Sequence, residues 1–229
     1  PRASRTVPFI SKVIDLPLAK LSAQLAVGKK LKGMNLNLHC QNGLIAVKKP
    51  VFPFNKFPQQ NVFLSPEMKS TGEVIGFDTY LGSAYAKAES GAGNSLPITG
   101  TVFISVNNSD KIKAIALARD FKELGFNLIA TEGTAKLFSE NGISVNPVFK
   151  VGESRPNVVD AIKNGEVQLV VNTPLGAQSR FDEYEIGRSA IRHKIPTITT
   201  ISGAQAAVRG IRNIKAGSIE YRSLQNVFS

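Results

Sequence analysis

The feature of this sequence that most constrains its fold is a regular alternation, after residue 97, of short β-branched runs and longer helical stretches. The first run, Thr101–Val106, predicts a strand, and residues 110–124 predict the helix that follows it. Later strands are predicted at 127–131, 145–148, 167–172 and 196–201, and later helices at 134–140, 157–163, 183–193 and, beginning the last one, 203–210. Strands that alternate with helices pair in parallel through right-handed crossovers. The pattern therefore predicts an α/β fold with a doubly wound, parallel five-stranded sheet.

Residues 1–93 have a different texture, in which turn formers dominate. One amphipathic helix is predicted within Pro17–Lys30, where leucines recur at helical spacing. The segment Val51–Pro58 is too rich in proline for a central strand and aromatic enough to pack against a larger unit. We therefore expect a mostly helical and irregular first part, separated near Ser90–Asn94 from a second domain at 94–229.

Composition narrows the classes of function. The chain has 28 Lys+Arg against 17 Asp+Glu, a formal charge of +11, which favours an anionic partner. No run of five basic residues occurs, so we expect no nucleic acid. One cysteine, Cys40, and two histidines, His39 and His193, argue against disulfides and zinc clusters. No apolar run reaches the roughly 20 residues of a membrane span, so we expect no membrane contact and a location in the cytoplasm or plastid stroma.

Polar side chains follow the predicted strands at their carboxyl ends, the edge where open parallel sheets bind ligands. The candidate binding residues are Ser105, Lys111, Thr131, Thr134, Lys150, Asn172 and Thr173. Taken singly, the threonines could be ordinary helix caps and the lysines ordinary solvated residues. Taken together they form an anion cradle, in which each charge-assisted contact contributes about 1.5 to 3 kcal/mol. The sequence thus predicts a small phosphorylated ligand and no catalytic residue or metal site.

Three segments carry a resemblance to a known family: Pro1–Phe9 (PRASRTVPF), Val51–Pro58 (VFPFNKFP) and Ser65–Gly76 (SPEMKSTGEVIG). In this order they resemble the C-terminal quarter of the large subunit of carbamoyl phosphate synthetase. The resemblance implies that residues 1–93 are the end of an ATP-grasp unit and its connecting segment. It also implies that residues 94–229 are a methylglyoxal-synthase-like allosteric domain.

In that family the allosteric domain binds a nucleotide monophosphate effector, uridine or inosine monophosphate, and the resemblance places it on the seven candidate residues. The parent would be an ATP-dependent ligase that uses magnesium (or manganese) and potassium to make carbamoyl phosphate from bicarbonate and glutamine-derived ammonia for arginine and pyrimidine synthesis. Its partners would be the rest of the large subunit and a glutamine amidotransferase small subunit. We expect this part alone to be inactive and to hold no cofactor. Arg2 and Arg5 are expected to flank the ATP site of the parent, beside an asparagine ligand that this chain lacks.

Two departures from the family pattern bear on the ligands. Many relatives read Thr-Thr-Ser-Gly after the asparagine strand, whereas Pro174 here supplies neither a hydroxyl nor an N–H group. In the ornithine activator site of bacterial relatives, Lys49 replaces a usual glutamate and Thr197 stands where a tyrosine can occur, although Thr199 remains. A cation in place of a carboxylate repels the ornithine ammonium group, so we expect ornithine to bind weakly or not at all.

Three other interpretations stay open. A methylglyoxal synthase acting on dihydroxyacetone phosphate needs a catalytic aspartate, and the corresponding loop here has Glu153. An inosinate cyclohydrolase-like domain would leave the SPEMKSTGEV segment without a role. In the third interpretation the effector site is vestigial, and residues 1–93 form a docking or homo-oligomerisation surface through the aromatic segment Val51–Pro58.

Overall fold

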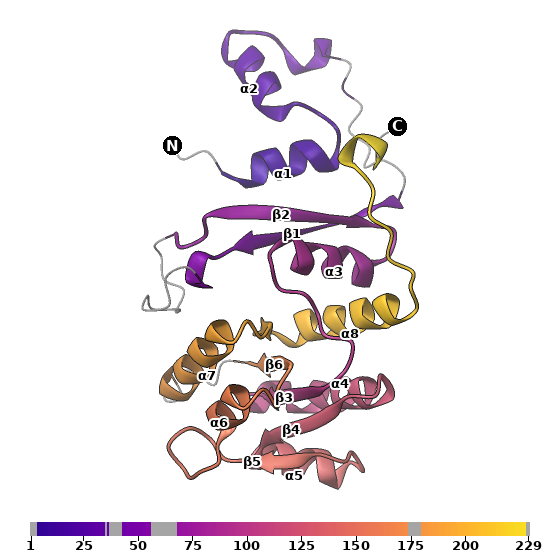
Figure 1. The fold of residues 1–229 in the computed structure, drawn as a ribbon. Coiled ribbons are helices and arrows are strands. Elements are labelled where there is room, and N and C mark those ends of the chain that lie inside the picture. Colours follow the sequence, from indigo (N-terminus) through magenta and orange to yellow (C-terminus); the bar gives the residue numbers. More distant parts are fainter. Residues whose placement is uncertain (1–3, 35, 37–42, 56–67, 174–179, 228–229) are drawn as a thin grey trace.

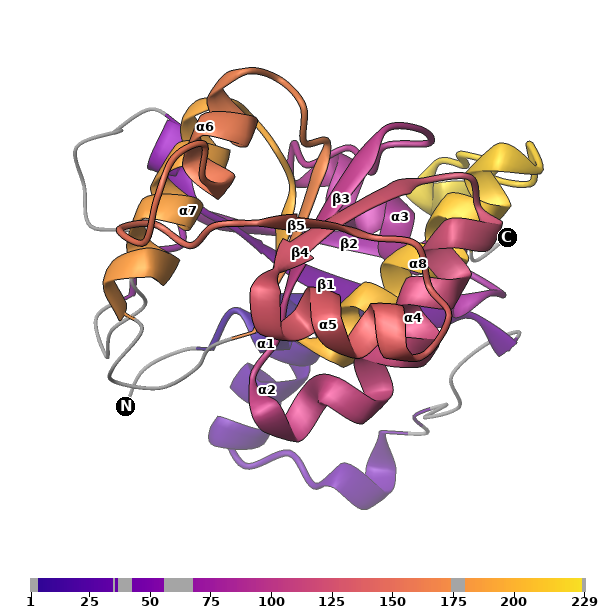
Figure 2. The ribbon, with the colours of Figure 1, turned by 90° about the horizontal axis from the view of Figure 1, so that it is seen from below.

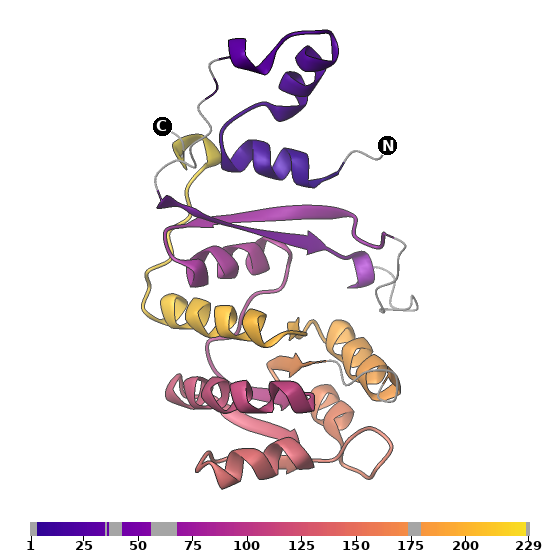
Figure 3. The same cartoon turned by 180° about the vertical axis from the view of Figure 1, so that it is seen from behind.

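The computed structural model describes residues 4–34, 36, 43–55, 68–173 and 180–227. Figure 1 shows the elements stacked in layers, which Figure 3 shows again from behind. Two short helices lie at one end, followed by a two-stranded sheet, two packed helices and the parallel sheet. The elements of the first part are α1 (Thr6–Val13), α2 (Leu18–Ala26), β1 (Ile45–Val51), β2 (Gly72–Asp78) and α3 (Leu81–Gly91), with short 3-10 turns at Leu31–Gly33 and Pro53–Asn55.

The second part alternates strands and helices as predicted. Its elements are β3 (Thr101–Ser105), α4 (Lys111–Glu123), β4 (Asn127–Thr131), α5 (Glu132–Glu140), β5 (Asn146–Val148), α6 (Val158–Lys163), β6 (Leu169–Asn172), α7 (Arg180–Arg192), β7 (Thr197–Ile198) and α8 (Ile201–Lys215), with 3-10 turns at Asn108–Asp110 and Leu224–Val227. The five strands pair in parallel in the order β5-β4-β3-β6-β7. The predicted doubly wound, five-stranded parallel sheet is confirmed.

Residues of each central strand alternate between the two faces of this sheet, so both faces are buried. Val102 and Ile104 of β3 belong to the core formed with α4, α5 and α8. Phe103, between them, belongs to the core formed with α6 and α7. Figure 2 shows these two groups of helices on opposite sides of the strands. The strand order reverses between β3 and β6, which is where ligands bind in folds of this kind.

Two predicted boundaries near the end of the sheet were wrong. The last strand covers only Thr197–Ile198, whereas the prediction ran to residue 201. The hydroxyl of Thr200 accepts a hydrogen bond from the N–H of Gly203 at 3.1 Å, so Thr200 caps α8. The chain therefore turns into the helix at Ile201, two residues before the predicted start.

The first part contains a sheet that the prediction of a mostly helical and irregular segment omitted. Strands β1 and β2 pair antiparallel, with Ile45 opposite Asp78 and Val51 opposite Gly72. Pro50 is the reason that β1 was not predicted, because a proline within a run of residues argues against a central strand. A two-stranded sheet has only edge strands, where a proline is tolerated. The predicted helix within Pro17–Lys30 is α2.

Helix α3 joins the two parts because it packs on β1–β2 and on α8. The backbone contact with α8 is close, since a Cβ on Gly82 would lie 2.6 Å from Arg209. Asn213 of α8 also donates a hydrogen bond to the hydroxyl of Ser83, at 2.8 Å. The division of the chain near residues 90–94 stays a prediction, and α3 in front of it is tightly fitted to the second domain.

Candidate functional site

The parallel sheet brings three of the candidate residues together at the point where the strand order reverses. Ser105 ends β3 and lies opposite Asn172, which ends β6. The N–H of Thr173 donates to the carbonyl of Ser105 at 3.0 Å, and the Thr173 hydroxyl accepts from the N–H of Asn107 at 3.0 Å. All three candidate side chains are buried, Thr173 to 1% exposure. The structure thus places them in one compact group at the carboxyl edge of the sheet.

Thr131 is the last residue of the neighbouring strand β4 and the N-cap residue of α5, and Thr134 lies in the first turn of that helix. Thr131 has the extended backbone of a helix-capping residue, yet its hydroxyl makes no capping hydrogen bond. The first N–H groups of a helix have no acceptor inside the helix and carry partial positive charge. Both threonines are buried, and they lie beside those N–H groups at the start of the helix.

The two lysines follow strand ends on the same edge of the sheet. Lys111 is the first residue of α4, which follows β3, and Lys150 comes two residues after β5. Only β4 separates β3 from β5, so the two strands lie about 10 Å apart. In the described part of the chain, Lys111 has no ion-pair partner, whereas the Lys150 ammonium lies 3.6 Å from a carboxylate oxygen of Glu153.

The surroundings of Lys150 are acidic. Burial raises the pKa of Asp182, at the start of α7, and the negative charges of Glu153 and Glu183 raise it further, whereas Lys150 opposes them. The raised pKa means that folding disfavours the ionised form of Asp182. Lys150 therefore lies near acidic side chains, which would repel an anion that binds to it.

The raised pKa of Asp182 predicts a pH-dependent effect of Asp182→Asn. Stability contributed by a carboxyl with a raised pKa is lost as the pH rises through that value, because the folded protein then carries the disfavoured charge. Asp182→Asn should therefore raise the melting temperature at pH 7 and above. The difference should vanish at pH values where both folded and unfolded Asp182 are protonated. Thermal melts of both proteins across this range provide the check, and an unchanged or lower melting temperature at neutral pH would contradict it.

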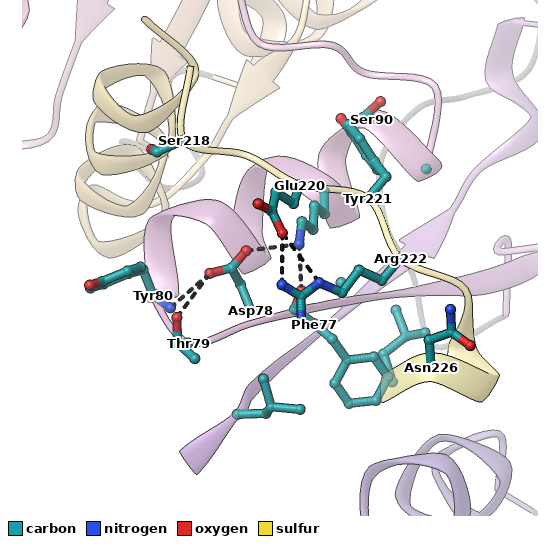
Figure 4. Close-up of a pocket in the computed structure, with 15 residues that line it drawn as sticks. Phe77, Asp78, Thr79, Tyr80, Ser90, Ser218, Glu220, Tyr221, Arg222 and Asn226 are labelled. Carbon is teal, nitrogen blue, oxygen red and sulfur yellow. Dashed lines mark hydrogen bonds and ion pairs between the residues drawn. The ribbon is translucent and has the colours of Figure 1, made fainter. Parts of the chain in front are cut away.

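A cavity of about 730 Å³ lies elsewhere, between β2, α3 and the C-terminal tail, and was not anticipated from the sequence (Figure 4). Its charged groups pair with one another: Lys87 lies 2.8 Å from Asp78, and Arg222 lies 2.7 Å from Glu220. Burial acts to raise the pKa of Asp78, but the hydrogen bond and charge of Lys87 lower it on balance. The cavity therefore offers no uncompensated cation to an anionic ligand, unlike the strand ends at Lys111.

The remaining sequence candidates fall outside this group. Arg5 donates hydrogen bonds to the carbonyl and hydroxyl of Ser70, at 3.2 and 3.4 Å, and so ties the start of α1 to the segment before β2. Lys49 forms a 2.6 Å ion pair with Glu89 of α3. Arg2, Cys40 and Pro174 lie outside the described residues.

The described residues contain no group of three histidine, cysteine, aspartate or glutamate side chains that could hold a metal ion. None of the helices in the described ranges is both long and apolar enough to cross a membrane.

Comparison with known proteins bears on the same residues. Residues 113–199 match the family model of the MGS-like domain. Over 98% of its length the chain is 48% identical to the carbamoyl phosphate synthase large chain of Nostoc sp. and 49% identical to that of Archaeoglobus fulgidus. It is 50% identical, over 93% of its length, to that of Pseudomonas syringae pv. tomato. This chain is related to carbamoyl phosphate synthase large chains. The predicted resemblance is confirmed.

The chain spans about a fifth of the length of these curated relatives. The MGS-like match runs from α4 to just after β7. It includes five of the candidate binding residues: Thr131, Thr134, Lys150, Asn172 and Thr173. Ser105, which ends β3, and Lys111, the first residue of α4, lie shortly before it.

Proposed function

We propose that this chain is the allosteric part of a carbamoyl phosphate synthase large chain, and that its MGS-like domain binds a nucleotide monophosphate at the carboxyl edge of the parallel sheet. One observation carries this proposal. One edge of the sheet holds buried hydroxyl groups, the N-terminus of α5 and Lys111, a cation without an ion-pair partner in the described part of the chain. That combination suits a phosphate dianion.

The geometry supports a division of roles among these residues. The phosphate would lie before α5, where it would meet the N–H groups at the start of this helix, the hydroxyls of Thr131 and Thr134, and the ammonium of Lys150 from the end of the neighbouring strand β5. Ser105, Asn172 and Thr173, at the reversal of strand order, would bind the polar atoms of the ribose or base. Lys111, at the start of α4, would contribute a positive charge to phosphate binding. Binding at this site involves no covalent step.

Binding would regulate the parent enzyme by favouring one of its conformations. An effector shifts such an equilibrium only by its difference in affinity for the two states, commonly about 1 to 3 kcal/mol. The same strand edge leads through the Thr200 cap into α8, and α8 packs on α3, which in turn packs on β1–β2. These contacts connect the first part of the chain to the proposed effector site through α3 and α8.

The rest of the large chain is the proposed partner of α1 and α2. Neither helix has a buried residue, although each has one apolar side. Val27 is 82% exposed and Leu31 58% exposed just after α2. Relatives about five times as long provide the polypeptide that would cover this surface. ATP, magnesium, potassium, the amidotransferase small subunit and carbamoyl phosphate synthesis belong to that whole enzyme in this proposal.

Titration calorimetry with uridine and inosine monophosphates tests the function directly. Wild-type protein should bind at least one of them. Lys111→Met and Lys150→Met should each weaken binding about tenfold or more, because each removes a charge-assisted contact to phosphate. Lys113→Met is the matched control, since Lys113 is an exposed lysine on the same helix as Lys111, and it should bind as wild type does.

Two outcomes of this titration would count against the proposal: wild-type protein binds neither nucleotide, or the three lysine variants lose affinity equally. In a separate assay, robust methylglyoxal production from dihydroxyacetone phosphate would identify an enzyme instead. Self-association without nucleotide binding would favour the docking interpretation. An ornithine titration should show weak binding or none, because the carboxylate of Glu89 is already occupied by Lys49, whose ammonium would repel a second ammonium group.

A further inference from the structure

The two lysines of the proposed site, Lys111 and Lys150, differ in whether a carboxylate pairs with them. One carboxylate oxygen of Glu153 lies 3.6 Å from the Lys150 ammonium, and the other accepts a hydrogen bond from the Lys150 backbone N–H at 3.1 Å. Glu153 is therefore fixed to Lys150 by both its oxygens. Lys111, across β4, has no such partner among the described residues.

The charges around Lys150 do not favour an anion as the structure stands. Asp182 and Glu183 lie in the first turn of α7, and the charges of Lys150, Glu153 and Glu183 all act on the Asp182 carboxyl. Lys150 thus pairs with one carboxylate, Glu153, and its charge also acts on a second carboxyl group, Asp182. An arriving phosphate would have to replace Glu153 as the partner of Lys150 and would be repelled by the same carboxylate.

We propose that Glu153 competes with the phosphate of the effector for Lys150 and thereby sets the affinity of the site. This inference rests on the proposed function, because it concerns the same strand edge. Glu153 acts as a built-in counter-anion: when no phosphate is bound it neutralises and orients Lys150, and when phosphate binds it is displaced. The side chain is about half exposed, so it can move into solvent without losing buried contacts.

Glu153→Gln is the informative variant, because glutamine keeps an oxygen that can accept from the Lys150 N–H and removes only the charge. It should bind uridine or inosine monophosphate about two- to fivefold more tightly than wild type, the range expected from loss of a partly exposed ion pair. The gain should shrink at high salt, which screens exposed charges. Glu153→Asp keeps the charge and should stay near the wild-type affinity.

Glu140→Gln is the matched control. It removes the same charge at the far end of α5, so it should leave the affinity unchanged. Inorganic phosphate is titrated as a second probe, and circular dichroism melts show that each variant is folded. If nucleotide binds but Glu153→Gln binds no more tightly than wild type and Glu140→Gln, the counter-anion role is wrong while the proposed function stands.

The phosphate titration separates the remaining outcomes. If no protein binds a nucleotide but Glu153→Gln binds inorganic phosphate more tightly than wild type, the nucleotide function fails and the role of Glu153 holds. If neither nucleotide nor inorganic phosphate binds to wild type or to Glu153→Gln, both proposals are overturned.

Discussion

Lys49→Met should lower the free energy of unfolding of this chain by roughly 3 kcal/mol, because it leaves a buried carboxylate without its cation. Glu89, on α3, has a side chain only 3% exposed, and its oxygen lies 2.6 Å from the Lys49 ammonium. Burial and the nearby charge of Glu89 raise the pKa of Tyr85, so its hydroxyl stays protonated and continues to hydrogen-bond to Glu89. One neutral donor cannot compensate a buried charge that has lost its counter-ion.

Lys48→Met is the matched control, one residue earlier on the same strand. Lys48 is 32% exposed and lies 3.5 Å from Glu73, so its loss should cost less than about 1 kcal/mol. Urea denaturation of both variants measures the difference. The double variant Lys49→Met/Glu89→Gln should recover much of the loss, because it removes the uncompensated charge. Equal losses for Lys48→Met and Lys49→Met would show that the Lys49–Glu89 pair is not an important buried interaction.

Gly82→Ala should cost about 2 to 3 kcal/mol by forcing α3 away from α8. A Cβ at position 82 would lie 2.6 Å from the carbonyl carbon of Arg209 and 2.8 Å from the backbone nitrogen of Gly210. Backbone atoms cannot move aside as a flexible side chain can, so the two helices must separate. The loss should appear as a lower denaturation midpoint in urea.

Gly91→Ala, in the same helix, provides the comparison. A Cβ there would lie 3.5 Å from the side chain of Val74, an ordinary van der Waals distance. Alanine is the better helix former, so this variant should be neutral or slightly stabilising. If Gly82→Ala were as stable as Gly91→Ala, the close approach of α3 and α8 would be wrong.

Sequence reasoning worked best where the signal is local and repeated. The run Thr101–Val106 and the helix after it were predicted from periodicity, and the structure has β3 and α4 within one or two residues of them. The same reasoning omitted both strands of the first sheet, β1 and β2, and the helices α1 and α3. Pro50 and the two lysines interrupt the alternation of β1, and α3 is composed largely of small residues with a weak amphipathic pattern. Neither segment has a strong local signal because its packing partners determine its structure.

The sequence by itself determined that the strands pair in parallel, because strands joined by helices connect through right-handed crossovers, and parallel strands have their carboxyl ends at one edge. It therefore also determined that Thr131, Asn172 and Lys150 would follow strands at one edge. Only the tertiary structure decided that Lys49 pairs with Glu89, 40 residues away, and that Ser83 meets Asn213, 130 residues away. These contacts depend on how α3 fits between β1–β2 and α8, and no local pattern of residues encodes such a fit.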